Sequence, residues 1–424
     1  MTHQEQWMNK SLLRQESSHY FIEDVKLTDI AQKFGTPAYV YSKKYILDQI
    51  NFLQNALSDI DHLICFAVKA NSNLSILKLF KECGCGFDIV SGGELQRVLT
   101  VDSLNSKIVF SGVGKSVSEI EMALNNNILA FNVESEEELF RINDISQHLS
   151  KIAKVSIRVN INVDAKTHPY ISTGLKDNKF GIDETSAIKL YKKAVTLDHI
   201  KITGIDCHIG SQITDLSPFE DAFIKLASLI DELESNQIAI EHIDIGGGIG
   251  ISYNNEDISP IDFYVQMIKK YLLKYNKKII LEPGRFLIGK AGLMLTNVEY
   301  IKKSEHKNFV LVDAAMNDLM RPSLYNAFHE VINLSNTQDS NDIFDIVGPI
   351  CETGDFLAKD RNIKAKQGDI LAIMDAGAYG FSMSSNYNSR PRVPEIIVDK
   401  DEFYMIRERE NFSDLIAHEE KFLK

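Results

Sequence analysis

The sequence predicts a (β/α)8 barrel of the TIM-barrel kind, followed by a mostly antiparallel β domain. Between Leu63 and Leu281, eight short apolar segments alternate with segments of helical periodicity, an alternation typical of parallel βα units. After Arg285 the long helical segments give way to short β-rich runs separated by Gly, Pro, Asn and Asp, as in antiparallel sheets. We therefore expect a barrel domain at residues 33–287 and a β domain formed by residues 1–32 together with 288–424.

The expected elements follow one another in a regular order. A short strand at 37–42 and an amphipathic helix to about Leu57 precede the barrel strands, because PAYVYS is β-prone and the next segment has helical spacing. The eight barrel strands are expected at 63–68, 87–90, 107–110, 129–133, 155–159, 202–207, 242–245 and 279–281. The helices between them are expected at 75–82, 93–101, 118–125, 136–149, 186–195, 218–233 and 262–275. Strands of the β domain are expected at 292–301, 309–312, 343–347, 370–374 and 395–398, with an exposed loop at 333–341.

Local signals mark several helix ends. Ser118 with Glu121 and Ser135 with Glu138 have the spacing of a capping box, so we expect a helix to begin at each pair. Asn236 is expected to end the helix before the seventh strand.

Composition narrows the class of protein. The chain has 424 residues, enough for two domains, and its 44% apolar and 25% charged content is ordinary for a globular protein. A formal net charge of −13 disfavours nucleic acid or an anionic membrane as the main partner. No apolar run is long enough to span a bilayer, and the polar N-terminus lacks a signal-peptide core, so a cytoplasmic protein is expected. The five scattered cysteines are expected to be reduced.

Polar and glycine residues follow seven of the eight expected barrel strands. They are Lys69, Ser91–Glu94, Ser111–Gly112, Arg158 with Asn160, His208, Gly246–Gly248 and Glu282–Arg285. Barrel enzymes build their active sites at the carboxyl ends of the strands. The pattern therefore predicts an active site at this end of the barrel.

Three of these features each allow more than one interpretation. Lys69 closes an apolar strand, where it either extends into water or serves as a desolvated amine that forms a Schiff base with a carbonyl substrate or pyridoxal phosphate. Gly246–Gly248 is either a tight turn or a phosphate cradle; it resembles a dinucleotide-binding motif only superficially, because it follows the seventh strand. Glu282 is a general base, a metal ligand or the partner of a protonated ring nitrogen.

His208 also allows three interpretations: it stacks on a planar cofactor, acts as a base, or is a buried core histidine. No further His or carboxylate lies at metal-ligand spacing, so we expect no metal. An amine, a phosphate cradle and an inward carboxylate together describe a site for pyridoxal 5'-phosphate.

Several long motifs carry a family resemblance. They are FAVKAN (66–71), FDIVSGGEL (87–95), CHIGSQ (207–212), DIGGGIG (244–250), EPGR (282–285), DAAMNDLMRPSLYNAFH (313–329), GPICETGD (348–355) and the segment 375–395. In this order they resemble the fold-type III pyridoxal phosphate decarboxylases, an alanine racemase-like fold, and most closely the diaminopimelate branch. Small departures, such as Ala315 where Gly is expected and Thr353 where Ser is frequent, fall on no residue with an expected role.

The resemblance implies a function and a set of residue roles. It implies decarboxylation of meso-2,6-diaminopimelate to L-lysine, the last step of the diaminopimelate pathway, by a homodimer whose active sites are completed across the interface. The implied cofactor residues are Lys69 as the Schiff-base lysine, His208, Ser211, Gly247, Gly248, Glu282, Pro283, Gly284, Arg285 and Tyr379. The implied substrate residues are Arg285, Arg321, Tyr325, Glu352 and Tyr379. The implied catalytic residues are Lys69, His208 and Cys351, of which Cys351 is the acid. The resemblance also implies that Cys351 and Glu352 are contributed by the partner subunit.

Competing interpretations remain at this point. Taken without the resemblance, Arg321 is a surface turn residue and Cys351 an inert buried thiol. Ornithine, arginine and carboxynorspermidine decarboxylases share the implied cofactor residues, but they do not need Arg285 and Arg321 for a second carboxylate. Alanine racemase uses a tyrosine base and lacks the Cys-Glu pair. A non-catalytic relative typically loses the lysine or the cysteine, and both are present here.

Overall fold

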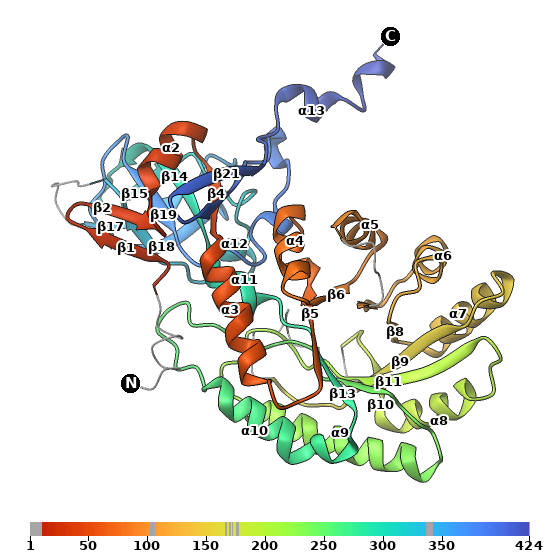
Figure 1. Ribbon diagram of the computed structural model, residues 1–424. Coiled ribbons are helices and arrows are strands. Elements are labelled where there is room, and N and C mark those ends of the chain that lie inside the picture. The colour runs from red at the N-terminus through yellow and green to blue at the C-terminus, as the bar shows by residue number, and fades with distance from the viewer. Residues whose placement is uncertain are drawn as a thin grey trace. The chain divides into compact units, whose positions relative to one another are not determined.

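The computed structural model describes residues 11–101, 107–165, 168, 171, 173–174, 178–335 and 342–423. Its contacts divide these residues into two compact units (Figure 1). The first unit consists of Ile50–Ile251 and Asp257–Phe286, and the second of 11–49, Ser252–Glu256 and 287–423. The domain boundaries expected from the sequence stay predictions, and the contact-based division differs from them by placing residues 33–49, Ser252–Glu256 and Leu287 with the second unit.

The first unit is a closed parallel barrel, which confirms the predicted fold class. Its strands are β5 (His62–Ala67), β6 (Gly86–Ile89), β7 (Ile108–Phe110), β8 (Ala130–Val133), β9 (Ala153–Asn160), β11 (Ile200–Asp206), β12 (His242–Asp244) and β13 (Lys278–Leu281). Each is hydrogen-bonded to its neighbour in the order β9-β11-β12-β13-β5-β6-β7-β8, and the pairing of β8 with β9 closes the ring. A two-residue strand, β10 (Ile182–Asp183), pairs with β9 outside the ring. All eight barrel strands therefore lie within a few residues of their predicted positions.

Helices follow the barrel strands in alternation and surround them (Figure 1). They are α4 (Leu74–Glu82), α5 (Gly92–Val101), α6 (Val117–Asn125), α7 (Glu136–His148), α8 (Glu184–Ala194), α9 (Ser217–Ser235) and α10 (Ile261–Tyr271) with η3 (Leu273–Tyr275). The predicted caps at Ser135 and Asn236 are confirmed. The predicted Ser118–Glu121 box is wrong, because Ser116 caps α6 and makes the capping box with Glu119. Both pairs have the Ser-x-x-Glu spacing, so the sequence alone did not distinguish them.

The second unit is built on a mostly antiparallel sheet, also as predicted. The strands, in the order in which they pair, are β18 (Phe356–Ile363), β17 (Asp342–Val347), β15 (Phe309–Val312), β14 (Gly292–Lys302), β4 (Ala38–Ser42), β20 (Glu395–Asp399) and β21 (Glu402–Arg407). Two further strands, β16 (Val331–Asn333) and β19 (Ile370–Ile373), pair with each other, and β19 also pairs with β14. The predicted strand at 37–42 is therefore part of this sheet, since β4 lies between β14 and β20.

The N-terminal part of the second unit contains three strands and a helix where the sequence analysis named no element. Strands β1 (Leu13–Glu16), β2 (His19–Ile22) and β3 (Val25–Lys26) form a small antiparallel sheet, and α2 (Leu27–Phe34) follows. Apolar side chains of β3 and α2 pack with those of β4, β14 and β20 in one buried cluster. The remaining helices are α3 (Lys43–Ala56), α11 (Arg285–Ile288), α12 (Arg321–Tyr325) and α13 (Phe412–Ile416).

Two further observations complete the fold. The predicted loop at 333–341 lies largely outside the described residues, since 336–341 are not among them. In the described part of the chain, no helix combines the length and the apolar character that a membrane crossing requires.

Candidate active site

Lys69 is held by a carboxylate from the neighbouring strand. It lies in the short helix η1 (Val68–Ala70) directly after β5, and its Nζ is 2.9 Å from Asp88 Oδ2. Asp88 lies within β6 and its side chain is fully buried, whereas the Lys69 side chain is 34% exposed. A buried carboxylate needs a charge partner or hydrogen bonds. Lys69 is therefore fixed at the carboxyl end of the barrel by an ion pair with a residue of the neighbouring strand β6.

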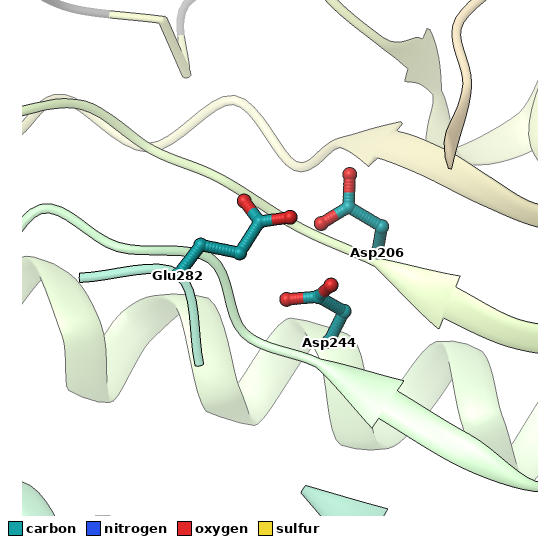
Figure 2. Close-up of side chains that lie close together, drawn as sticks. All are labelled: Asp206, Asp244 and Glu282. Atoms are coloured by element: carbon teal, nitrogen blue, oxygen red, sulfur yellow. The ribbon is translucent and has the colours of Figure 1, made fainter. Parts of the chain in front are cut away.

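Three further carboxylates converge at the same end of the barrel (Figure 2). Asp206 ends β11, Asp244 ends β12 and Glu282 directly follows β13. One carboxylate oxygen from each lies within 4.8 Å of the others, and all three residues are buried. Adjacent parallel strands bring their ends together, which explains how residues far apart in sequence meet here.

Burial and mutual repulsion make these carboxylates reluctant to ionise. Burial, followed by the charge of neighbouring carboxylates, raises the pKa of Asp206 and of Glu282 well above their usual values, and burial raises the pKa of Asp244 to about 7. Asp206 Oδ1 and Asp244 Oδ2 are buried without a hydrogen-bond partner among the described residues. Full ionisation of the cluster is therefore disfavoured, and the cluster has unused hydrogen-bonding capacity.

Glu282 is oriented by neutral donors. Its Oε1 accepts hydrogen bonds from Ser111 Oγ at 3.3 Å and from Asn132 Nδ2 at 3.2 Å, and Asn132 also donates to Ser111 Oγ at 3.1 Å. Ser111 follows β7 and Asn132 lies in β8. Two neighbouring strands thus set the direction of the carboxylate.

His208 is held in one tautomer. The backbone N–H of Gly247 donates to His208 Nδ1 at 3.1 Å, so Nδ1 is the acceptor and Nε2 carries the hydrogen in the neutral ring. Burial, with the positive charges of Arg158 and Lys69, lowers the pKa of His208 well below its usual value. The imidazole is therefore neutral at physiological pH.

The glycine run after β12 comes very close to neighbouring backbone. Gly246 and Gly248 have φ angles of +66° and +108°, and a Cβ on Gly248 would lie 2.6 Å from the carbonyl oxygen of Gly210. Nearby, Arg285 Nη2 donates to Ser211 Oγ at 3.1 Å. The structure therefore brings together the predicted residues from strands β11, β12 and β13, with Pro283 and Gly284 in the turn between Glu282 and Arg285.

A second buried ion pair lies beside this group, and sequence reasoning assigned it no role. Glu134, directly after β8, accepts from Arg158 Nη1 at 2.9 Å and from the backbone N–H groups of Gly112 at 3.1 Å and Gly181 at 3.0 Å. Arg158 Nε also lies 3.9 Å from Asp206 Oδ2. Burial by itself lowers the pKa of Arg158, but Glu134 and Asp206 outweigh it and leave the pKa raised.

The second unit carries the remaining predicted residues, beginning with Arg321 and Tyr325 at the two ends of α12. Arg321 is buried, and its Nη1 lies 2.8 Å from His329 Nε2. Tyr325 is partly exposed at the end of the helix. The expectation that Arg321 is a surface turn residue does not hold, because its side chain is enclosed by protein.

Cys351 and Glu352 lie on an exposed loop whose base is fixed by Asp355. The two oxygens of buried Asp355 accept from the backbone N–H groups of Met316 and Ile350, each at 2.7 Å. Cys351 is exposed and its N–H donates to Asn388 Oδ1 at 3.1 Å, and Glu352 accepts a short hydrogen bond from the Tyr387 hydroxyl. The alternative of an inert buried thiol therefore does not describe Cys351 in this chain.

Tyr379 stands in an unusual backbone conformation. Its φ angle of 55° lies in the left-handed region, which a bulky side chain adopts rarely and at a cost. The segment 375–395 in which it lies has three other non-glycine residues of this kind: Asp375, Asn388 and Ser389.

Sequence reasoning missed the buried polar residues inside the strands. Asp88, Asn132, Asp206 and Asp244 are all fully enclosed in the barrel. The available signal was an acidic or amide residue inside an otherwise apolar strand, as in FDIV and FNV. Spacing along the chain gave no sign of the carboxylate cluster, since its members come from three different strands.

Comparison with known proteins identifies the family to which the chain is related. The model of the pyridoxal-binding domain of pyridoxal-dependent decarboxylases matches residues 43–289. A diaminopimelate decarboxylase of Neisseria meningitidis serogroup A is 52% identical over 399 residues, which cover 94% of this chain and 98% of the relative.

Two solved structures are also similar. Diaminopimelate decarboxylase from Helicobacter pylori complexed with L-lysine has a TM-score of 0.91 at 44% identity, covering 94% of this chain and all of the other. The enzyme from M. jannaschii in co-complex with L-lysine has a TM-score of 0.92 at 40% identity, covering 97% of this chain and 98% of the other. The barrel, its lysine and carboxylates, and this likeness along nearly the whole chain establish that it belongs to the diaminopimelate decarboxylase family of pyridoxal-dependent decarboxylases.

Proposed function

We propose that this chain decarboxylates meso-2,6-diaminopimelate to L-lysine and CO2, with pyridoxal 5'-phosphate as its cofactor. The observation that carries the proposal is that two solved relatives sharing its fold over more than nine-tenths of the chain hold L-lysine, the product of this reaction. The residues on which the proposal depends divide into those that hold the cofactor and those that choose the substrate.

The first unit has the groups that pyridoxal phosphate requires. Lys69 offers an amine, Glu282 a buried carboxyl group that can face the ring nitrogen, and the glycine run N–H groups that suit a phosphate. The buried carboxylate oxygens without partners, on Asp206 and Asp244, mark a site with unused hydrogen-bonding capacity. When bound, the cofactor supplies an electron sink for the bond that breaks.

The phosphate group would be held by several small groups at the ends of three strands. Ser211, Gly247, Gly248 and the Pro283–Gly284–Arg285 turn offer backbone N–H groups and a hydroxyl. The contact between Arg285 and Ser211 keeps a positive charge beside them. His208, neutral and fixed in one tautomer by Gly247, would lie against the ring, and Tyr379 would contact the cofactor as well.

Substrate choice would depend on arginine. Diaminopimelate carries a second carboxylate that ornithine and arginine lack at that position, and a guanidinium grips a carboxylate through two parallel hydrogen bonds. We assign this task to Arg285 and Arg321, with Tyr325 and Tyr379 as further contacts. Both arginines are buried, which strengthens their attraction for an anion compared with the same pair in water.

The last step requires a proton at the carbon that loses CO2. Cys351 would donate it, and Glu352 would bind the distal amino group of the substrate. We propose that both are provided by the partner subunit of a homodimer. Their exposure in the single chain supports this, because a residue given to another subunit has to be accessible on its own.

Spectroscopy and peptide mapping test the role of Lys69. We expect Lys69→Ala to lose the visible absorbance of bound pyridoxal phosphate and its turnover, and borohydride reduction of the wild type to fix the cofactor on the peptide that contains Lys69. Lys78→Ala is the matched control, because Lys78 is exposed on α4. Turnover by Lys69→Ala at the wild-type rate would overturn the assignment.

Steady-state assays test the substrate. We expect kcat/KM for meso-diaminopimelate to exceed that for ornithine or arginine by at least a hundredfold, about the difference that one desolvated carboxylate–guanidinium pair makes. A preference for a substrate without the distal carboxylate would refute the proposal.

A further inference from the structure

Arg321 is fixed by two uncharged groups within the second unit. Its Nη1 lies 2.8 Å from His329 Nε2, and its Cζ lies 4.5 Å from the centre of the Tyr253 ring. His329 and Tyr253 also contact each other edge to face, with ring centres 5.5 Å apart. The three side chains therefore form a small buried stack, in which Arg321 meets a nitrogen acceptor on one side and an aromatic face on the other.

The hydrogen bonds of His329 define its tautomer. Its Nδ1 lies 2.7 Å from the carbonyl oxygen of Met374, and a carbonyl only accepts, so Nδ1 carries the hydrogen. Nε2 is then the lone-pair nitrogen and accepts from Arg321. A protonated ring would place a hydrogen on Nε2 against the guanidinium. The arrangement thus requires neutral histidine, which its complete burial favours.

Tyr253 is in turn held by its own loop. The backbone N–H of Tyr253 donates to Glu256 Oε2 at 2.7 Å, and that of Asn254 donates to the same oxygen at 2.6 Å. The ring is buried, and a guanidinium above an aromatic face is attracted by the ring quadrupole. The short segment Ser252–Glu256 therefore contributes a rigid face to the stack.

We infer that His329 and Tyr253 are positioning residues that fix the guanidinium of Arg321 for the distal carboxylate of the substrate. The inference rests on the proposed function, in which Arg321 binds that carboxylate. An arginine side chain loses much rotamer entropy when it is fixed, and fixing it before the substrate arrives removes that loss from binding. These two partners are uncharged, so they orient the guanidinium without forming an ion pair with it, whereas a carboxylate in the place of the imidazole would compete with the substrate.

Two amide substitutions of His329 separate positioning from packing. In His329→Gln the amide reaches the position of Nε2 and keeps an acceptor for Arg321. In His329→Asn the amide takes the position of Nδ1, so the bond to Met374 survives and the acceptor for Arg321 is lost. We expect His329→Asn to raise KM for meso-diaminopimelate about tenfold or more with kcat within about threefold of wild type, and His329→Gln to lie closer to wild type. Tyr253→Phe should resemble wild type, and Tyr253→Leu should raise KM.

Inhibition constants test whether the effect of His329→Asn is specific for the distal carboxylate. L-lysine keeps the distal carboxylate and cadaverine lacks it. In His329→Asn the Ki of L-lysine should therefore rise by about the same factor as KM, while the Ki of cadaverine stays within about twofold of wild type. A rise of both Ki values together, or a fall in kcat with KM unchanged, would indicate a merely structural role and would overturn the inference. Should His329→Asn fail to accumulate as folded protein, Tyr253→Leu is measured in the same way and decides by the same criteria.

Arg321→Met distinguishes this inference from the proposed function. If Arg321→Met leaves KM for meso-diaminopimelate and the Ki of L-lysine unchanged, the role of Arg321 in the proposed function fails, and the inference fails with it. If Arg321→Met raises both constants and His329→Asn and Tyr253→Leu raise neither, the inference alone fails.

Discussion

Glu134 connects the segment after β7 and the segment before β10 to Arg158 of β9, and its removal should be costly. Its two carboxylate oxygens accept from Arg158 and from the backbone N–H groups of Gly112, just after β7, and Gly181, just before β10. The side chain is 2% exposed. Breaking a buried ion pair by removing one partner costs about 3–5 kcal/mol, because the other charge is left buried and uncompensated.

Glu134→Gln is the sharpest test, because it preserves shape and removes only the charge and one acceptor. The amide can accept from Arg158 and Gly112, but its NH2 group then faces the N–H of Gly181, donor against donor. With about 2–4 °C of Tm per kcal/mol for a domain of 150–250 residues, the loss corresponds to roughly 6–20 °C. Differential scanning calorimetry measures it directly.

The matched control lies two residues along the chain. Glu136 pairs with Lys193 at the start of α7, and both side chains are about half exposed. An exposed pair contributes less than about 1 kcal/mol, so Glu136→Gln should shift Tm by no more than roughly 4 °C. If the two variants lost the same stability, the argument from burial would be refuted.

Two further predictions concern pH and thiol reactivity. Burial lowers the pKa of His242 to about 4, so its contribution to stability is complete above the unfolded pKa of about 6.5 and is lost as the pH falls toward 4. Between pH 7.5 and 5 the free energy of unfolding in urea should therefore fall by about 2 kcal/mol more for the wild type than for His242→Gln. Equal losses in the two proteins would contradict the reasoning. Iodoacetamide should label exposed Cys351 first, because burial raises the pKa of Cys85 to about 12 and the pKa values of Cys65 and Cys207 well above the usual value. L-lysine should slow both this labelling and the inactivation that accompanies it. Mass spectrometry of the labelled native protein measures the order, and labelling of Cys85 before Cys351 would be the contrary result.

The barrel was predictable because its signal is repeated. Eight apolar runs of similar length alternate with amphipathic segments, and each repeat supports the same interpretation, so errors at single ends do not matter. Two of the strands missed in the second unit have the opposite character. β18 (FLAKDRNI) and β21 (EFYMIR) are the two ends of the sheet order, and edge strands carry charged residues that hide the alternation.

The site was predictable only as far as chain position reveals it. Lys69, His208 and Glu282 stand at strand ends, and a parallel barrel brings such ends together whatever the details. Asp88 and Asn132 lie inside strands, and which groups they meet depends on strand order and on the direction of each side chain. The contact of Arg321 with His329 could not be predicted either, since the sequence places them eight residues apart without showing that the second nitrogen of His329 is bound to Met374.

The carboxylate cluster implies that the barrel gives up stability for function. Asp206 lies beside Asp244 and Glu282, and burial, then the charge of Asp244, raises its pKa well above the usual value. A carboxyl group whose folded pKa is raised destabilises the fold as pH rises above its unfolded pKa of about 4. Asp206→Asn removes the ionisable carboxyl group with little change of shape. It also removes the charge that lies 3.9 Å from Arg158 Nε, but Arg158 retains its ion pair with Glu134 at 2.9 Å.

Without cofactor, the variant should therefore be more stable than the wild type at pH 8, by about 1–2 kcal/mol, and nearly equal to it at about pH 4, close to the unfolded pKa, where little of the penalty has developed. Thermal unfolding at both pH values measures the difference, and Asp221→Asn, an exposed substitution on α9, should show no such dependence. Turnover of the variant should fall, because the electrostatic surroundings of Glu282 change with it. A variant less stable than the wild type at pH 8 would mean that the contact of Asp206 with Arg158 outweighs the repulsion within the cluster, and the account of the cluster as a source of instability would be wrong.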